Sequence, residues 1–208
     1  MRTVPGVVTG IVKRVDDPGG LGRVQVEFPW LDQSYRTDWA PIAAPLTGKG
    51  RGAFFMPEID DEVLVSFNHG DFDHPFIVGF LWNGVDKPPE TDLKNRVILT
   101  PGGHTLRFED GNAKKIILRS SSGHEIVLDD AGQKITITSA GKHSMTFDDI
   151  GHSLTITSAG GHRIALNDMA QTIIVQFMGG GSIIMTQASL VLQHGHGITI
   201  SPAGIAFA

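Results

Sequence analysis

The sequence predicts an all-β protein that combines a small N-terminal barrel with a C-terminal array of short repeated strands. Glycine occurs 26 times in 208 residues, above the usual share of about 7% and typical of a chain with many tight turns. No stretch has a useful helical periodicity. Ten of the eleven prolines lie at or before Pro101, and the last is Pro202. Because proline is excluded from continuous hydrogen-bonded ladders, this asymmetry predicts two kinds of β structure.

The boundary between the two parts falls in a polar stretch rich in glycine and proline, residues 83–91. All three tryptophans and the single tyrosine precede it. We expect a barrel domain over residues 1–88, a linker over 89–102 and a second domain over 103–208.

The first domain contains five runs that favour strands. They cover residues 6–12, 24–28, 39–43, 62–67 and 76–82, and a turn signal at residues 16–20 separates the first two. Five short strands without helices predict a small closed barrel, and the OB-type barrel is one of the few that closes with this strand number.

Composition argues against several function classes. The formal net charge is −5, and the basic residues of the barrel are few and diluted by acids, so we expect no nucleic-acid binding. With no cysteine, the chain offers no disulfide, thiolate metal site or cysteine nucleophile. No run of 18 apolar residues occurs, and residues 1–6 lack the apolar core of a signal peptide, so we expect neither a spanning helix nor export by the general route. The loop from His69 to His74 offers metal donors, but its spacing matches no ligand set and favours a solvated hairpin loop.

The second domain repeats itself with a period near 20 residues. His104, His124, His143 and His162 each follow a glycine corner at spacings of 20, 19 and 19 residues, and Gly181 continues the series. Each unit then carries an acidic or amide pair and a second apolar run; the pairs are Glu109 and Asp110, Asp129 and Asp130, Asp148 and Asp149, and Asn167 and Asp168. Such a period is typical of a solenoid or a fibre, with one unit forming strand, turn, strand and turn.

Alternation within the runs predicts two different faces. His124, Ile126 and Leu128 share one face, whereas Glu125, Val127 and Asp129 share the other. A flat ribbon cannot bury its apolar face, so that face must close around an axis, either in one chain that coils or in several chains that wrap together.

The repeated histidines stand at the strand entrances on the apolar side. They are candidates for rings that hold ions along an axis. The favoured interpretation is a corner histidine bonded to backbone or water, because each unit offers only one.

Two further histidines, His194 and His196, share the parity of Leu192 and Ile198 and are predicted to point into the apolar axis. One chain supplies too few nitrogens for a closed metal site. Three chains would supply six imidazoles, an octahedral set suited to a first-row metal such as iron.

The whole length resembles baseplate assembly protein V and the VgrG-type central spikes of contractile injection systems. The phrases that carry the resemblance are Gly6–Val12, Gly22–Trp30, Pro57–Phe67, His74–Asn83, Gly123–Gly132 and Gln133–Ser139, in this order.

The resemblance implies an OB-fold collar domain followed by an intertwined triple-stranded β-helix, a homotrimeric needle with its tip at the C-terminus. It implies a structural, non-enzymatic spike that sits on the tail hub or baseplate and pierces a target cell envelope when the sheath contracts. The spike would be assembled in the cytoplasm and would act in a virion or an extracellular injection particle. Some family members bind iron through an inward His-x-His, which His194 and His196 match. The apolar tail 205–208 is either a folded apex or a platform for a PAAR-repeat tip protein.

Rival interpretations come from other classes. A monomeric β-solenoid could bind carbohydrate or act on polysaccharide, with Asp129, Asp130, Asp148 and Asp149 as carboxylates. Those acids recur with the strand period, as turn residues do, whereas catalysis needs a unique constellation. We therefore expect no catalytic residues.

Overall fold

The computed structural model describes residues 4–31 and 35–207. Within these ranges every regular element is a β-strand except one 3-10 turn, η1 (Asn68–Gly70), which confirms the all-β prediction. The first three residues of the N-terminal segment and Ala208 of the apolar tail lie outside the described residues. No described helix has the length and apolar content needed to cross a membrane. The chain divides into two compact units, Met1–Pro88 and Pro89–Ala208.

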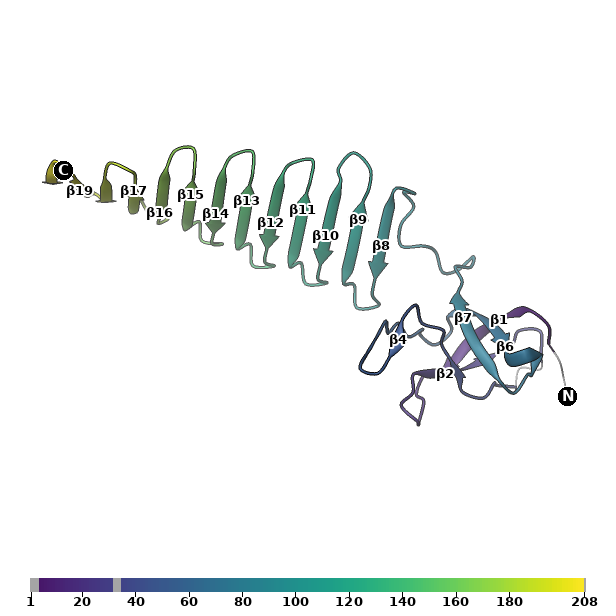
Figure 1. The fold of residues 1–208 in the computed structure, drawn as a ribbon. Coiled ribbons are helices and arrows are strands. Elements are labelled where there is room, and N and C mark those ends of the chain that lie inside the picture. The colour runs from purple at the N-terminus through teal and green to yellow at the C-terminus, as the bar shows by residue number, and fades with distance from the viewer. Residues whose placement is uncertain (1–3, 32–34, 208) are drawn as a thin grey trace. The chain divides into compact units, whose positions relative to one another are not determined.

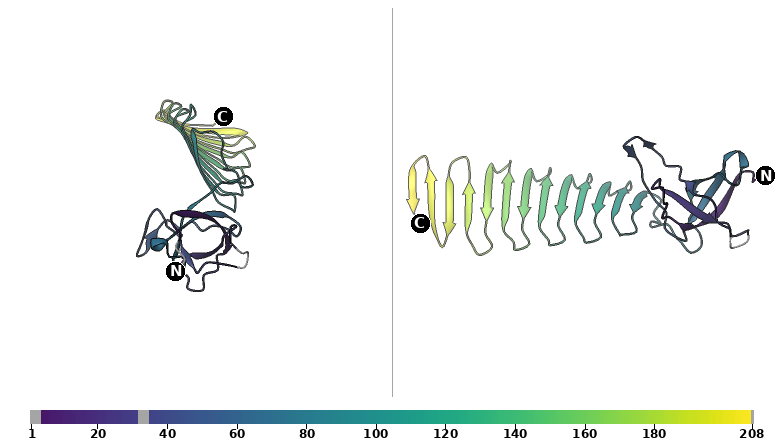
Figure 2. Two further views of the ribbon diagram at one scale, coloured as in Figure 1. Left: turned by 90° about the vertical axis from the view of Figure 1, so that its right-hand side faces the viewer. Right: turned by 90° about the horizontal axis from the view of Figure 1, so that it is seen from below.

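The first unit is a five-stranded, nearly closed barrel. Its strands are β1 (Val7–Arg14), β2 (Arg23–Glu27), β3 (Ala40–Pro41), β6 (Glu62–Phe67) and β7 (Pro75–Phe80), in the sheet order β3-β2-β1-β6-β7. A parallel bridge between Ile42 and Ile77 joins the two ends of this sheet. Seen end on, the strands form a ring (Figure 2). The predicted OB-type barrel is therefore present.

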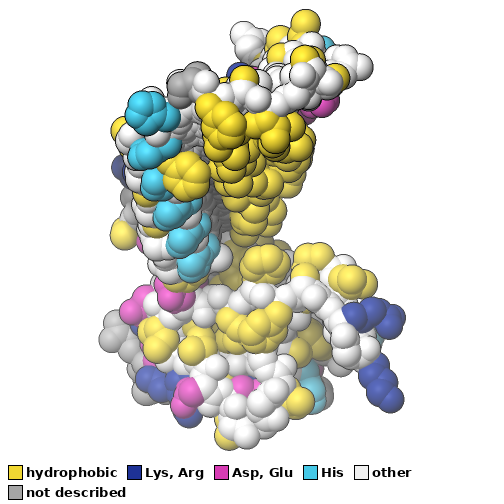
Figure 3. All heavy atoms as spheres, turned by 90° about the vertical axis from the view of Figure 1, so that its left-hand side faces the viewer, with side chains coloured by type: hydrophobic (Ala, Val, Ile, Leu, Met, Phe, Trp, Pro, Cys, Tyr) yellow, Lys and Arg dark blue, Asp and Glu magenta, His cyan; other side chains and the backbone are white. Residues whose placement is uncertain are grey.

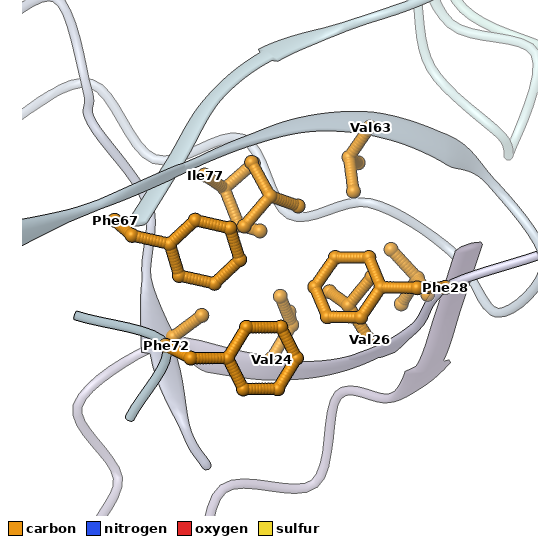
Figure 4. Packing of buried hydrophobic residues seen from close by; sticks show 10 residues of the cluster. Val24, Val26, Phe28, Val63, Phe67, Phe72 and Ile77 are labelled. Atoms are coloured by element: carbon orange, nitrogen blue, oxygen red, sulfur yellow. The ribbon is translucent and has the colours of Figure 1, made fainter. Parts of the chain in front are cut away.

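The barrel encloses the hydrophobic core of this unit. Alternate residues of β2 and β6 point inward, and their side chains pack against three phenylalanines, Phe28, Phe67 and Phe72 (Figure 4). Gly10 of β1 faces the core, where a Cβ would lie 2.3 Å from Cγ1 of Val26. The close approach of β1 to β2 thus depends on the missing side chain at Gly10.

The predicted turn between β1 and β2 is organised by Asp17. Its carboxylate, only 3% exposed, accepts the N–H groups of Gly19 and Leu21 and two hydrogen bonds from the guanidinium of Arg23. These bonds, above all those from Arg23, hold the pKa of Asp17 well below its usual range.

One element of this unit was not predicted. The strands β4 (Thr47–Gly48) and β5 (Arg51–Gly52) pair in a separate two-stranded sheet. Two-residue strands carry no period that sequence reasoning can detect. The run predicted over 39–43 contracts to the two residues of β3.

The second unit is one antiparallel sheet of thirteen strands. Its members are β8 (Asn95–Leu99), β9 (Thr105–Glu109), β10 (Lys115–Arg119), β11 (Glu125–Asp129), β12 (Lys134–Thr138), β13 (Ser144–Asp148), β14 (Ser153–Thr157), β15 (Arg163–Asn167), β16 (Thr172–Gln176), β17 (Ser182–Met185), β18 (Leu190–His194), β19 (His196–Ser201) and β20 (Gly204–Phe207). Each strand pairs with its sequence neighbours, so the sheet is a meander (Figure 1).

The structure corrects the linker predicted over residues 89–102. Residues 95–99 form β8, the first strand of the sheet, because Glu90 ties this segment in place. Its carboxylate accepts a hydrogen bond from Nδ2 of Asn95 at 3.0 Å and forms an ion pair with Nη1 of Arg107 at 2.8 Å.

The meander also shows that the single chain does not close its apolar face by coiling as a solenoid. Neighbouring strands of the sheet are antiparallel throughout, whereas the coils of a β-helical solenoid stack in parallel. The single chain therefore forms an open, single-layered sheet and does not coil around its own apolar face (Figure 2).

Candidate functional site

One face of the thirteen-stranded sheet is almost entirely apolar. Cross-strand partners share a face, and the register assembles two continuous columns that contain one arginine, Arg96, at the β8 end. The other members of this apolar face are Phe108, Ile116, Leu128, Ile135, Phe147, Leu154, Leu166, Ile173, Met185, Leu190, Ile200 and Ile205 in one column, and Ile98, Leu106, Leu118, Ile126, Ile137, Met145, Ile156, Ile164, Val175, Ile183, Leu192, Ile198 and Phe207 in the other. The predicted parity of the strands is thus confirmed.

The apolar face is uncovered in the single chain. Its side chains gather on one side of the sheet (Figure 3). Most of them are exposed, for example Phe108 at 36% and Leu118 at 52%, and others, such as Leu106 and Ile126, are partly buried. Monomeric soluble proteins rarely expose a contiguous apolar patch larger than a few hundred Å². A patch that follows all thirteen strands is typical of an interaction surface.

The opposite face carries paired charges and hydroxyl groups. Lys115 pairs with Asp129 and Lys134 with Asp148, each at 2.9 Å across neighbouring strands. The backbone N–H of Gly132 and the Lys115 ammonium hold the pKa of Asp129 below its usual value, and Asp129 in turn raises the pKa of Lys115. Its central column also contains apolar residues, among them Ile117, Val127, Ile174, Ile184 and Val191, so the charges lie mainly at the ends of the strands.

The acids considered as catalytic carboxylates are turn residues. Asp148 accepts the N–H of Gly151 at 2.8 Å, as Asp129 does for Gly132. These bonds, together with Lys134, lower the pKa of Asp148 as well. Asp130 and Asp149 likewise hold equivalent places, each donating its backbone N–H to the preceding hairpin corner. A general acid needs a raised pKa in a unique environment, so this recurring geometry favours a structural role.

The repeated histidines form a column along one edge of the sheet (Figure 3). In each case Nδ1 accepts the backbone N–H of a residue in the next corner along that edge, 16 or 17 residues later. The pairs are His104 with Ser121, His124 with Ala140, His143 with Ala159 and His162 with Met178, at 3.2–3.3 Å. The corner role favoured by the sequence is therefore confirmed. Because Nδ1 is the acceptor, the neutral ring carries its proton on Nε2.

His194 and His196 meet at the same edge, near the C-terminal end of the sheet. The sequence predicted one continuous run, but Gly195, with φ of 72°, turns the chain between β18 and β19. The two histidines are direct cross-strand partners, so they still share the apolar face. The predicted common face holds because His194 and His196 are two residues apart, and a turn of one residue between them leaves both side chains on the same side of the sheet.

The two histidines line an open cavity of about 480 Å³ together with Phe177, Ile183, Leu192 and Ile198. Gly181 occupies the corner position that histidine holds in earlier repeats, and a Cβ there would lie 3.1 Å from Nδ1 of His194. Within the described residues no three metal-ligating side chains of one chain gather at a single point. Within one chain, His194 and His196 thus supply two imidazoles, fewer than a closed metal site needs.

The remaining site predictions concern the barrel. In the loop from His69 to His74, Nδ1 of His74 lies 2.9 Å from Oδ2 of Asp71. The N–H of Asp73 and the imidazole of His74 lower the pKa of Asp71. Lys13, Arg14 and Arg23 each pair with a nearby aspartate, which removes them from any continuous basic groove.

The fold is thus an OB-type barrel followed by a repetitive antiparallel sheet with one uncovered apolar face. Residues 8–82 match the model of the type VI secretion system/phage-baseplate injector OB domain. The first unit therefore resembles the baseplate-injector OB domain, and the chain is similar to the VgrG-type spike proteins.

Parts of the chain are also similar in sequence to curated VgrG proteins. The chain is 29% identical over 122 residues, or 52% of its length, to the type VI secretion system spike protein VgrG3 of Vibrio cholerae. It is 32% identical over 108 residues, or 46% of its length, to a V. cholerae protein named actin cross-linking toxin VgrG1. It is 30% identical over 83 residues, or 38% of its length, to the spike protein VgrG2a of Pseudomonas aeruginosa. The matched segments span only 10–12% of these relatives.

Among solved structures, the G-box domain of the microcephaly protein CPAP aligns over 55% of this chain and 97% of its own, at 14% identity and a TM-score of 0.34. This likeness contributes nothing to the functional assignment.

Proposed function

We propose that three copies of this chain assemble into a spike of a contractile injection machine, with their apolar faces packed together around a common axis. The observation that carries the proposal is the uncovered apolar face of the thirteen-stranded sheet. Fully covering an isoleucine, leucine or phenylalanine is worth about 1.5–3 kcal/mol. Each chain has 25 of these side chains, and most of them are more than a third exposed, so covering them supplies a large driving force even after the cost of association.

Wrapping several chains also protects the sheet from uncontrolled pairing. The strands β8 and β20 are the free edges of a long sheet, and exposed apolar edges promote aggregation. An intertwined trimer would cover the apolar face between these edges and leave the edges themselves only at the two ends of the sheet. The ladders and the continuous core would give the spike stiffness under axial load without any catalytic group.

In this proposal the OB unit attaches the spike to the tail hub or baseplate, and the sheet unit leads into the target cell envelope when the sheath contracts. The relatives' printed names, which describe type VI spike proteins, support this role. Assembly would occur in the cytoplasm, and the spike would act in a virion or an extracellular injection particle. The tail folds back as β20 on β19 and leaves Ile205 and Phe207 exposed, which suits either an apex or a seat for a PAAR-repeat tip protein.

The metal prediction belongs to the same assembly. Three chains would bring six imidazoles of His194 and His196 to the axis, and an iron ion there would bind neutral imidazoles and cross-link the chains. Elemental analysis of the purified protein tests this. We expect one iron per three chains and its loss in His194→Ala with His196→Ala; a metal-free wild-type protein would remove the site.

Native mass spectrometry tests the assembly itself. We expect a species at about three times the chain mass of 22.3 kDa and an elongated particle in electron micrographs, alone and bound to a baseplate. A stable monomer at micromolar concentration would overturn the proposed function.

A further inference from the structure

The hairpin of β4 and β5, with the flanking residues 46–55, stands apart from the barrel sheet of the OB unit; we call it the hairpin arm. The strands β4 and β5 pair only with each other, and the N–H of Ala53 donates to the carbonyl of Leu46 at 2.9 Å to close the base. An isolated two-stranded hairpin is marginally stable in water. Nevertheless this one exposes Leu46, Phe55 and above all Phe54, whose side chain is 78% exposed.

The same unit carries a second apolar surface, along β7 and the residues that follow it. Phe76, Val78 and Phe80 are exposed at alternate positions, and Trp82 continues the series at 64% exposure. We call this set the β7 stripe. An outward surface of four large apolar side chains on a small barrel marks a contact site.

An acidic loop adjoins the C-terminal end of the β7 stripe. It runs from Glu58 to Asp61 and into Glu62, the first residue of β6; this segment contains four carboxylates and exposes Ile59. The carbonyl of Glu62 accepts the N–H of Leu81 at 3.0 Å, which places the loop beside Phe80 and Trp82.

The charges of the arm and of the loop are complementary and unpaired. Lys49 and Arg51 of the hairpin form no ion pair with any residue in the described ranges, and the same holds for Glu58 and Glu62 of the loop. By contrast, Lys13 is already paired with Asp60 of the same loop. The unit therefore keeps two cations beside one apolar surface and two anions beside another.

We propose that the hairpin arm of one copy docks on the β7 stripe and acidic loop of the next copy, so that three OB units close into a ring. The proposal rests on the proposed trimer, which holds the OB units at high effective concentration. A contact between two different surfaces of identical subunits is heterologous, and it closes into a ring when the subunits are related by a threefold rotation. Phenylalanines of the arm would cover the stripe, and Lys49 and Arg51 would face Glu58 and Glu62.

Cross-linking between chains tests the proposal cleanly, because the natural chain has no cysteine. Two full-length variants, Thr47→Cys with one affinity tag and Ile59→Cys with another, are co-expressed, purified through both tags and treated with a short bismaleimide. We expect a cross-linked pair of differently tagged chains at least tenfold more abundant than either identically tagged pair. No cross-link between the two tags, or equal yields of all three pairs, would overturn the docking mode.

Charge reversal gives an independent measurement. In the same assay, Lys49→Glu with Arg51→Glu should lower the yield of cross-linked pairs about tenfold, because like charges then face each other. Adding Glu58→Lys with Glu62→Lys should restore it. The exposed Lys87, which also forms no ion pair within the described residues, supplies the matched control Lys87→Glu, and this variant should leave the yield unchanged.

The native mass separates this inference from the proposed function. A trimer without cross-links between the tags refutes the ring of OB units and leaves the spike intact; the arm would then be free for a hub protein. A monomer refutes the spike and, with it, the ring.

Discussion

The sharpest prediction concerns which face of the sheet lies inside the assembly. Ile137 of β12 belongs to the apolar face, between Ile126 and Met145, and its neighbour Thr136 lies on the opposite face, between Val127 and Thr146. The two positions are adjacent in the same strand. The pair Ile137→Asp and Thr136→Asp therefore changes only the face that receives the charge.

The expected loss of association free energy differs between the two variants by an order of magnitude. Ile137 is 41% exposed in the single chain, so covering the rest of its side chain is worth about 0.6–1.2 kcal/mol per chain. Placing a carboxylate on a covered face costs several kcal/mol more for each ion. Three copies at one level of a trimer would cost on the order of 10 kcal/mol, or about ten-millionfold in association. Thr136→Asp keeps the carboxylate off the apolar face, and its cost is about 1 kcal/mol in strand propensity.

Native mass spectrometry and light scattering, over a range of protein concentrations, measure this difference. We expect Ile137→Asp to be monomeric or aggregated and Thr136→Asp to stay trimeric. A trimeric Ile137→Asp protein, or dissociation caused by Thr136→Asp instead, would refute burial of the apolar face.

Three further predictions concern single contacts. His124→Ala should speed exchange of the Ala140 amide about two- to tenfold, the value of one lost hydrogen bond, while the Ala159 amide, held by His143, serves as the internal control in hydrogen-exchange measurements. Gly10→Ala should destabilise the OB unit by about 1–3 kcal/mol in urea titrations because of the 2.3 Å approach to Val26, whereas Gly84→Ala, with open space around it, should change little. The lowered pKa values of Asp129 and Asp148 mean that these groups stabilise the fold above their unfolded pKa of about 3.9 and that this contribution disappears as the pH falls through their folded values. Asp129→Asn with Asp148→Asn should flatten the acid side of the melting-temperature profile, and an unchanged slope would contradict the assigned bonds.

Much of the fold follows from the sequence because alternation and period are physical constraints. The spacing of His104, His124, His143 and His162 identifies the corners, since each ring must reach the next corner along one edge. Parity alone assigns the two faces, as the register shows.

Other features leave no such trace. The hairpin of β4 and β5 has strands too short for a pattern, and β8 precedes the first histidine corner, so it resembles a linker. The turn at Gly195 could not be predicted from the alternation of side chains, for a different reason. His194 and His196 share a face whether the chain continues straight or folds back, so parity cannot separate the two conformations.

The histidine column has a consequence for how this molecule could change length. One repeat contains two strands, which advances the sheet by about 9.6 Å, and its corner bonds connect only to the repeats on either side. Deleting residues 124–142 would join Gly123 to His143 and recreate a corner of the same type, whereas removal of a single strand would place every later histidine on the wrong edge. The length of the sheet therefore changes in whole repeats: copying or deleting about 19 residues adds or removes one pair of strands and keeps every histidine on the same edge.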